Sequence, residues 1–396
     1  MPTPAIVRLK PGHVQPVWMG HPWVYAQAGD RVEGGATAGD EVSVVDPRGN
    51  LLGRGLYSPG SAIPVRLLVR DDSTRLDAAF FRARVQHAVA LRASLGMPSS
   101  HTTGFRLIHA EGDGLPGLVV DRYGDAIAVQ FGTIGMKLRE AEVLDALWEV
   151  AAPKTIIDRT SAQTAKIEKF TPGSGIVRGD AIEALQMRER DLIFQLPLEI
   201  GQKTGFYFDQ RSLRARVEQL AHGRRVLDAY SFVGAFAIAA ARGGAREVLA
   251  VDESALAIEV GAECARANGV GDTVKFVKQD ARHALAEAHG GFDLVIADPP
   301  RLAPNRAARD QALLAYAKLA ENACRATKPG GFLVFCSCSA AVDLHALTRA
   351  LAQGATRANV SVTVLERWFQ GADHPVPAAF GEGLYLKALI ARVEAR

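Results

Sequence analysis

The chain has few cysteines and no long apolar run. Only four of its 396 residues are cysteine: Cys264, Cys324, Cys336 and Cys338. They form no CxxC pair, which excludes a disulfide framework and the usual zinc or redox motifs, so no metal site is expected. No window reaches the roughly 18 to 20 apolar residues of a membrane span, and the first residues lack the apolar core of a signal peptide. These absences predict a cytoplasmic protein with reduced thiols.

The chain also lacks a strong charge of either sign. Lys and Arg number 46 against 43 Asp and Glu, a net charge of +3. Bulk charge is therefore no evidence for a nucleic-acid partner, and a basic surface must come from local clustering. The composition, 48% hydrophobic and 22% charged, supports buried cores. The length predicts two or three domains.

Three regions differ in pattern. Residues 1–72 combine short apolar strands with turn clusters and predict a small β-rich module. Residues 73–195 mix helical and strand patterns and predict a central α+β domain. Residues 196–396 alternate strand and helix, which is typical of a doubly wound, Rossmann-like sheet. The sequence thus predicts an α/β protein of three domains.

Acidic residues follow three successive strands expected in the third region: Asp228, Asp252 and Asp280. Each is about one strand–helix unit from the next, so all three should lie at the same edge of the sheet. The first suits the ammonium of a methionine moiety, the second ribose hydroxyls and the third the exocyclic amine of adenine. The alternative for each is a solvated Asp that ends a strand.

The loop after the first of these strands distinguishes two cofactors. Residues 228–234 contain one glycine, whereas a dinucleotide needs a GxGxxG loop that brings the backbone close to a pyrophosphate. S-adenosylmethionine has no phosphate, so we expect S-adenosylmethionine rather than NAD. The predicted cofactor contacts are Asp209, Gln210, Asp228, Tyr230, Ser231, Phe232, Gly234, Asp252, Ser254, Asn268, Asp280, Ala281 and Asp298.

A dense polar and aromatic run, residues 201–211, comes just before the first strand. It contains Asp209 and Gln210. One interpretation is a domain linker in which Asp209 caps a helix. The other is a lid over the cofactor, with Asp209 and Gln210 as polar contacts.

Two short motifs indicate the chemistry. Asp298-Pro299-Pro300 and Ser337-Cys338-Ser339 each end an apolar run typical of a buried parallel strand, residues 292–297 and 331–336. Ligands bind at the carboxyl ends of such strands, so a carboxylate and a thiol are expected to meet there. Enzymes that methylate an exocyclic amine usually place an aromatic residue after a similar motif. Arg301 stands there instead, which disfavours that reaction.

The thiol suits methylation of cytosine at carbon 5. Addition of a thiolate to carbon 6 makes carbon 5 nucleophilic, and Asp298 can hydrogen-bond to the ring. Cys336 shares a strand face with Cys338 but lies within the apolar run, where thiols are usually inert. We therefore expect Cys338 as nucleophile, and Cys264 and Cys324 as structural. The alternatives are methylation of a guanine nitrogen by the same fold, which needs no thiol, and a non-catalytic RNA-binding assembly factor.

These motifs together resemble the bacterial 23S ribosomal RNA cytosine-5 methyltransferases that carry an N-terminal PUA domain. The likeness extends over essentially the whole chain and rests on residues 8–10, 21–25, 53–59, 106–118, 203–205, 209–211, 231–234, 298–300, 337–339, 373–375 and 382–387. The chain departs from the family pattern at Gln202, where histidine is common, and at Arg301, where lysine is common, and it has an extra thiol in Cys336.

The resemblance implies a β-barrel-like PUA module, a pocket for S-adenosylmethionine, and Cys338 as the nucleophile. It also implies that the substrate is large-subunit ribosomal RNA, methylated at carbon 5 of one cytidine. Arg54, Arg66 and Arg301 are then the expected RNA contacts. The sequence leaves the oligomeric state open, and the resemblance suggests a homodimer.

Overall fold

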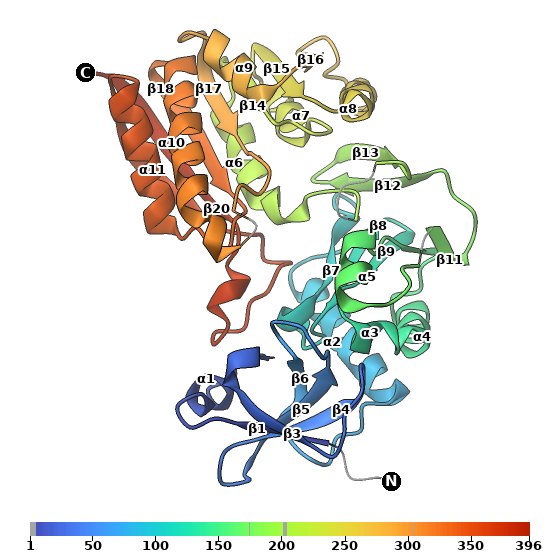
Figure 1. Cartoon of the computed structure of the whole chain (residues 1–396). Coiled ribbons are helices and arrows are strands. Elements are labelled where there is room, and N and C mark those ends of the chain that lie inside the picture. The colour runs from blue at the N-terminus through green and yellow to red at the C-terminus, as the bar shows by residue number, and fades with distance from the viewer. Residues whose placement is uncertain (1–4, 174, 201–203, 304) are drawn as a thin grey trace. The chain divides into compact units, whose positions relative to one another are not determined.

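The computed structural model describes residues 5–173, 175–200, 204–303 and 305–396 (Figure 1). The chain forms two compact units. The first comprises Met1–Arg188, Gly201–Phe206 and Ala372–Gly383. The second comprises Glu189–Ile200, Tyr207–Gly371 and Leu384–Arg396.

The first unit begins with a six-stranded sheet of order β2-β6-β5-β4-β1-β3. Its elements are β1 (Ala5–Leu9), α1 (Val14–Trp18), β2 (Trp23–Val24), η1 (Ala26–Ala28), β3 (Gly29–Glu33), β4 (Glu41–Val45), β5 (Leu51–Tyr57) and β6 (Val65–Val69). Gly55 allows β5 to lie against β6, since a Cβ there would lie 2.1 Å from the carbonyl oxygen of Arg66. The expected β-rich module is confirmed.

The rest of the first unit is built on a five-stranded sheet of order β11-β10-β9-β8-β7. Its elements are α2 (Ala78–Ser94), β7 (Gly104–His109), η2 (Ala110–Asp113), β8 (Leu118–Tyr123), β9 (Ala126–Phe131), α3 (Ile134–Lys137), α4 (Glu140–Ala151), β10 (Thr155–Asp158), α5 (Ala162–Glu168), β11 (Gly175–Gly179), and η5 (Gly381–Gly383) from the C-terminal segment. Helix α2 begins where the carboxylate of Asp77 accepts a hydrogen bond from the backbone N–H of Phe80 (3.1 Å).

Strands β12 (Ala184–Glu189) and β13 (Leu192–Pro197) lie where the chain passes into the second unit. The second unit holds a seven-stranded sheet of order β16-β15-β14-β17-β18-β20-β19. Its strands are β14 (Arg225–Ala229), β15 (Glu247–Asp252), β16 (Val274–Lys278), β17 (Phe292–Ala297), β18 (Thr327–Ser337), β19 (Val360–Trp368) and β20 (Lys387–Ala395). Strands β14 to β18 pair in parallel, and β20 is antiparallel to both neighbours.

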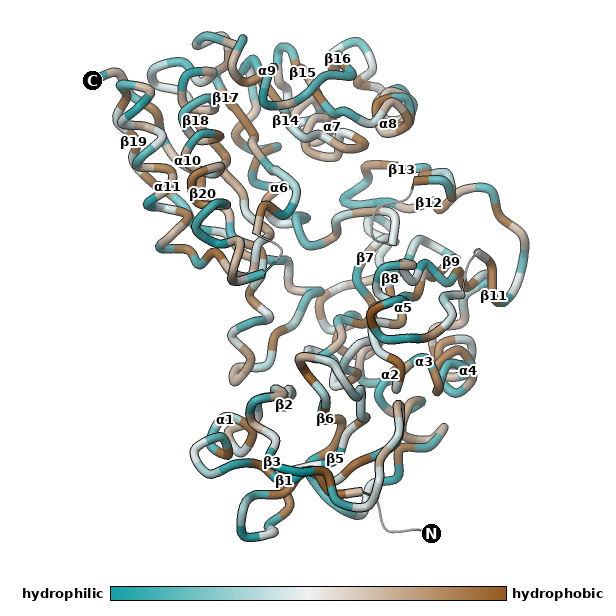
Figure 2. Tube along the Cα trace, in the orientation of Figure 1, coloured by the Kyte–Doolittle hydropathy of each residue, from teal (hydrophilic) through white to brown (hydrophobic). Residues whose placement is uncertain are grey.

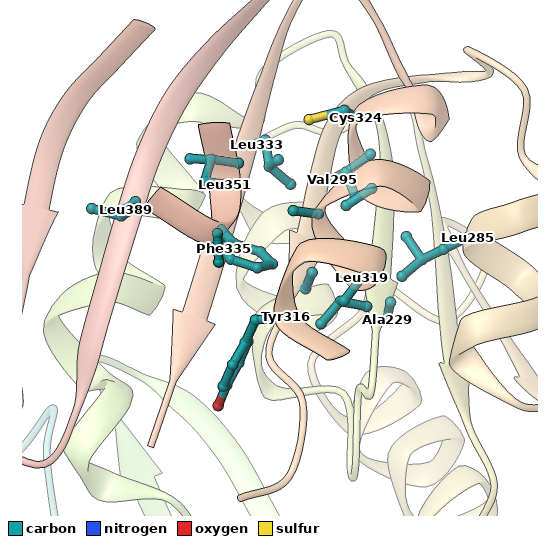
Figure 3. Close-up of a cluster of buried hydrophobic side chains, with 14 of the residues drawn as sticks. Ala229, Leu285, Val295, Tyr316, Leu319, Cys324, Leu333, Phe335, Leu351 and Leu389 are labelled. Atoms are coloured by element: carbon teal, nitrogen blue, oxygen red, sulfur yellow. The ribbon is translucent and has the colours of Figure 1, made fainter. Parts of the chain in front are cut away.

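Helices cover both faces of this sheet. They are η3 (Phe208–Gln210), α6 (Arg211–Leu220), α7 (Ala235–Arg242), α8 (Ala255–Ala267), α9 (Ala281–Glu287), η4 (Arg306–Ala308), α10 (Arg309–Ala326) and α11 (Leu344–Arg357). Helices α9, α10 and α11 share one hydrophobic core with the sheet (Figure 3). Teal and brown residues alternate along α8 in Figure 2, as in amphipathic helices that bury one side. The doubly wound fold predicted from the sequence is confirmed.

At one edge of the hydrophobic core of the second unit, the side chain of Tyr316 presents a polar hydroxyl group. The rings of Tyr316 on α10 and Phe335 on β18 pack edge to face, with centroids 6.1 Å apart. The hydroxyl oxygen of Tyr316 points away from the apolar side chains drawn in Figure 3. No helix in the described ranges has the length and apolar character required to cross a membrane.

Candidate active site

All but one of the expected site residues of the second unit lie near one edge of its sheet; the exception is Asn268. We call this edge, formed by the carboxyl ends of β14, β15, β17 and β18, the carboxyl rim. Ala229 is in register with both Val251 and Ala297, and Ala297 with Phe335. Strand order reverses between β14 and β17, which is where ligands bind in open α/β sheets.

Asp228 lies at the centre of the carboxyl rim and is almost fully buried. Its Oδ2 accepts a hydrogen bond from the backbone N–H of Ala237 (3.0 Å). Its Oδ1 has no hydrogen-bond partner among the described residues. Burial raises the pKa of this carboxyl well above its ordinary value, and the negative charges of Asp298 and Asp252 raise it further. An unsatisfied buried carboxylate oxygen fits a ligand that brings a cation or a donor.

The loop after β14 is held tightly at the rim. Tyr230 and Phe232 adopt positive φ angles of 65° and 51°. The backbone N–H of Phe232 donates to Asp252 Oδ2 (2.8 Å), and that of Ser254 donates to Asp252 Oδ1 (2.9 Å). The Oγ of Ser231 is buried and, in the described part of the chain, has no partner. Left-handed backbone at residues other than glycine is typical of functional sites.

Gly234 has a structural role in this loop. Its φ is +70°, and a Cβ there would lie 2.5 Å from Cε1 of Phe276. The glycine therefore permits close packing against β16, rather than an approach to a phosphate. This agrees with the choice of S-adenosylmethionine over a dinucleotide.

The third acid, Asp280, caps helix α9. Its Oδ1 accepts from the backbone N–H of Arg282 (2.8 Å), and its carboxylate also pairs with the Arg282 guanidinium. The Arg282 hydrogen bond lowers the pKa of Asp280 to about 2. Burial raises the pKa of Tyr230 to about 12, with a contribution from the charge of Asp280. Ala281 is the first residue of α9, so it lies beside these groups.

The segment before α6 reaches the rim through two buried side chains. Gln210 Nε2 donates to Asp298 Oδ2 (2.9 Å), while Asp209 Oδ2 accepts from the Tyr385 hydroxyl (2.7 Å). Asp209 belongs to η3 and does not cap α6 through its side chain. Residues 201–203 of the same sequence run, including Gln202 and Lys203, lie outside the described residues.

Tyr207 and Tyr385 are site residues that sequence reasoning missed. Burial raises the pKa of Tyr207, and the charges of Asp298, Asp209 and Cys338 add to that effect. Tyr207 therefore lies among the groups predicted to react. Its position in the polar and aromatic run was the available signal for Tyr207. No sequence pattern links Tyr385 to Asp209, since the two are far apart in the chain.

The four cysteines, all within the described residues, differ in exposure. Cys338 is partly exposed, whereas Cys264, Cys324 and Cys336 are buried. Burial raises the pKa of the Cys336 thiol well above its ordinary value, and Asp298 raises it further. A neutral buried thiol is a poor nucleophile. Exposure therefore favours Cys338 as the reactive sulfur.

The side chains of the serines on either side of Cys338 are held by hydrogen bonds. Ser337 Oγ donates to the Tyr316 hydroxyl (2.8 Å), which lies 3.2 Å from Ser339 Oγ. Ser339 Oγ also accepts from the backbone N–H of Ala303 (3.1 Å), in the segment that follows Asp298-Pro299-Pro300. These hydrogen bonds join the two motif loops.

Asn268 does not belong to this site, which corrects its assignment as a cofactor contact. It caps the carboxyl end of α8, whose 13 residues span about 20 Å away from the carboxyl rim. Its side chain instead holds the backbone of Ile193: Oδ1 accepts from the N–H (2.8 Å) and Nδ2 donates to the carbonyl (2.7 Å). Ser254, at the amino end of the same helix, does lie at the rim, where its Oγ accepts from Ala257 N (3.2 Å).

Two of the expected RNA contacts are buried or mostly buried in the first unit. Arg54 is buried and satisfied internally, with Nε donating to the carbonyl of Asp71 (2.9 Å) and Nη1 to Glu41 Oε1 (2.6 Å). Arg66 is mostly buried, and that burial lowers its pKa. This burial disfavours both arginines as phosphate contacts. Arg301, which follows the Asp298 motif, is exposed and remains a candidate.

Comparisons with known proteins define the class. Residues 7–70 match the model of a PUA-like domain, and residues 153–392 match that of the S-adenosylmethionine-dependent methyltransferases. Two solved structures share the fold. One is a methyltransferase, SMU.776, complexed with SAH (TM-score 0.85, 20% identity, 98% of this chain and 99% of that one). The other is a SAM-dependent methyltransferase from Streptococcus mutans (TM-score 0.83, 19% identity, 98% and 99%).

Closer relatives identify the group. The ribosomal RNA large subunit methyltransferase I of Shewanella denitrificans is 35% identical over 98% of this chain and 99% of its own length. The protein of that name from Yersinia pestis is 34% identical over 94% and 95%. The chain therefore belongs to the S-adenosylmethionine-dependent methyltransferases, in the family of ribosomal RNA large subunit methyltransferase I.

The rim fits the cofactor of this family. Asp228 Oδ1 and Ser231 Oγ are buried polar atoms for which the described residues supply no partner. Asp252 and Asp280 offer further carboxylates beside them, and the loop lacks the glycines that a pyrophosphate requires. These hydrogen-bond acceptors therefore suit an ammonium, hydroxyls and an amine, which S-adenosylmethionine carries.

Proposed function

We propose that this protein methylates carbon 5 of a cytidine in large-subunit ribosomal RNA through a covalent adduct with Cys338. The observation that carries the proposal is the partly exposed thiol of Cys338, which directly follows β18, beside the strand β17 that Asp298 directly follows. The substrate is inferred from the relatives, which are named ribosomal RNA large subunit methyltransferases.

The cofactor would be held by acids of the carboxyl rim. Asp228 would bind the ammonium, Asp252 the ribose hydroxyls and Asp280 the amine of adenine, with the loop of residues 230–234 beneath. Gln210 and Asp209 would close the pocket from the segment before α6. When bound, S-adenosylmethionine supplies an electrophilic methyl group to carbon 5.

The chain's own residues carry the rest of the reaction. The Cys338 thiolate forms a bond to carbon 6, and the electron pair of the carbon 5–carbon 6 double bond makes carbon 5 nucleophilic. Asp298 hydrogen-bonds to the ring nitrogen or the amine and stabilises the adduct. Once carbon 5 is methylated, its proton passes to a water molecule, the electrons of that C–H bond restore the double bond, and the Sγ–C6 bond breaks to release Cys338. The target base must be unpaired or turned out of a helix to reach this site.

We further propose that the chain works as three domains, residues 1–72, 73–195 and 196–396. The PUA-like domain would hold structured RNA through phosphate and shape, and the third domain would carry the chemistry. Arg301 would contact the RNA next to the reacting base.

The test compares the parent protein with Cys338→Ala and the matched control Cys336→Ala. Each is incubated with methyl-labelled cofactor and large-subunit ribosomal RNA, and the labelled nucleosides are identified. We expect label in 5-methylcytidine that Cys338→Ala abolishes and Cys336→Ala retains. Label in a purine that survives both substitutions would overturn the proposal and favour methylation of a guanine nitrogen. Absence of any label, with cofactor binding lost as well, would favour a non-catalytic RNA-binding factor.

A further inference from the structure

A buried lysine contacts the loop that carries Cys338. Lys387 is the first residue of β20, pairs with Ser337 across the sheet, and is 3% exposed. Its Nζ donates to the carbonyl oxygens of Ser339 and Tyr385, both over 2.8 Å. The ammonium therefore holds the backbone of the residue that follows Cys338.

This lysine is buried without a carboxylate partner. Among the described residues, no Asp or Glu lies within salt-bridge distance of its Nζ, and both of its hydrogen bonds go to neutral carbonyls. Burying an unpaired ammonium is costly, so a lysine at such a place normally has an anion to interact with. Burial lowers the pKa of Lys387 to about 8, while the charges of Cys338 and Asp343 oppose that effect and Arg301 adds to it.

Three further groups that interact electrostatically with Cys338 are weak acids. Cys338 interacts electrostatically with Tyr207, Cys336 and Tyr316, and Asp298 is a shared neighbour of all three. None of these groups can supply a positive charge, and an anionic Asp298 disfavours a second anion close by. The protonated side chain of Lys387 acts in the opposite direction.

We infer that Lys387 is a positioning residue that fixes the Cys338 loop and favours the thiolate form of Cys338. The hydrogen bond to the carbonyl of Ser339 holds the loop, and the positive charge lowers the free energy of the anionic sulfur. The thiol proton leaves to solvent, which the partly exposed Cys338 reaches. The catalytic use of this thiolate rests on the proposed function, but its formation does not.

Three substitutions separate hydrogen bonding from charge. Lys387→Gln keeps two N–H donors for the two carbonyls and removes the charge. Lys387→Arg keeps the charge. Lys328→Met is the matched control, because Lys328 lies at the opposite end of β18, where its Nζ pairs with Asp293 Oδ1 (3.1 Å).

The experiment measures the rate at which iodoacetamide alkylates Cys338 as a function of pH, with the modified peptide identified by mass spectrometry. We expect Lys387→Gln to move the midpoint of this profile up by about one pH unit, which slows alkylation at neutral pH about tenfold. Lys387→Arg and Lys328→Met should react within about twofold of the parent at neutral pH. An unchanged profile in Lys387→Gln would overturn the inference.

The inference can still be tested if a Lys387 variant fails to fold. Circular dichroism and binding of S-adenosylhomocysteine show whether each variant is folded. If Lys387→Gln does not fold, Lys387→Arg decides: its guanidinium stays charged above pH 8, so its midpoint should lie at or below that of the parent. A midpoint above that of the parent would contradict the inference.

The two proposals fail separately. The alkylation experiment uses no RNA, so a shifted thiol profile in an enzyme that forms no 5-methylcytidine overturns the proposed function alone. Formation of 5-methylcytidine with an unshifted profile in Lys387→Gln overturns the role of Lys387 alone.

Discussion

Gln210 donates a hydrogen bond from its side-chain amide to Oδ2 of Asp298 over 2.9 Å. The two residues are 88 positions apart in the chain, and both belong to the second unit. The bond orients a carboxylate at the carboxyl rim and ties it to the segment before α6. The Oε1 of Gln210 is buried and accepts no hydrogen bond from another residue of the described ranges.

Replacing this amide with a carboxyl should produce a pH-dependent defect. Gln210→Glu sets two carboxylates side by side, and the loss of a hydrogen bond to a charged group costs about 1.5 to 3 kcal/mol. We expect kcat for methylation to fall about tenfold or more at pH 8. Protonation of one carboxyl restores the bond, so the defect should shrink toward pH 6. An equal loss at both pH values in the kcat profile would contradict this role of Gln210.

Asp228→Asn should stabilise the cofactor-free protein while weakening cofactor binding. Burial raises the pKa of Asp228 in the folded state, so its contribution to stability is fully present below its unfolded pKa. That contribution is lost as the pH rises toward the folded pKa. The amide carries no charge and avoids this loss, so the variant should melt at the higher temperature at pH 8, with a smaller difference at pH 5.

The same variant should bind S-adenosylhomocysteine about tenfold more weakly, a change of about 1.4 kcal/mol. Thermal unfolding at both pH values, with and without that ligand, measures both effects. A lower melting temperature at pH 8 without ligand would show that the charge of buried Asp228 does not destabilise the cofactor-free protein.

Tyr316→Phe should loosen the Cys338 loop. It removes the hydroxyl that joins Ser337 Oγ and Ser339 Oγ, and leaves both in a buried site. We expect a loss of about 1 to 3 kcal/mol in the free energy of unfolding, measured with urea. Tyr57→Phe, on β5, is the control, because the Tyr57 hydroxyl makes no hydrogen bond to another described residue. If both variants unfold at the same urea concentration as the parent, the hydroxyl does not hold the loop.

Arg301→Ala should weaken RNA binding without affecting the cofactor. An exposed arginine that contacts one phosphate contributes one counterion, so the slope of log affinity against log salt should fall in magnitude by about one. Arg349→Ala, exposed on α11, serves as control. Filter binding of large-subunit ribosomal RNA across salt concentrations gives both slopes. Equal slopes in parent and Arg301→Ala would remove Arg301 from the RNA surface.

Arg92→Met should strongly destabilise the first unit. Arg92 is buried, pairs with both oxygens of Asp113, and donates from Nη2 to the carbonyl of Asp373 (2.7 Å). Removing one member of a buried ion pair leaves an uncompensated charge and costs about 3 to 5 kcal/mol. Arg82→Met on the same helix breaks an exposed pair with Glu149 and should cost under about 1 kcal/mol. Urea unfolding measures the free energy of unfolding of both variants. Equal losses would contradict the larger contribution expected of the buried ion pair.

Local patterns in the sequence determined the strands and acids of the second unit. Apolar runs such as residues 292–297 form strands that are buried on both faces of a parallel sheet. They can therefore be recognised as strands from the sequence alone. The acids that follow them reach the carboxyl rim because strand direction alone places them there. The same reasoning separated Cys338 from the buried Cys336, since one lies past the end of the apolar run.

Contacts between distant segments were decided only by the tertiary structure. A helix length carried Asn268 away from the rim, and the packing of the first unit buried Arg54 against Glu41. Lys387 lies opposite Ser337, one residue before Cys338, because β20 inserts antiparallel between β18 and β19. Side-chain type shows what a residue can do, whereas its partners depend on which strands and helices pack together. Which strands and helices pack together depends on how the whole chain buries its apolar surface, and a local sequence pattern does not contain that information.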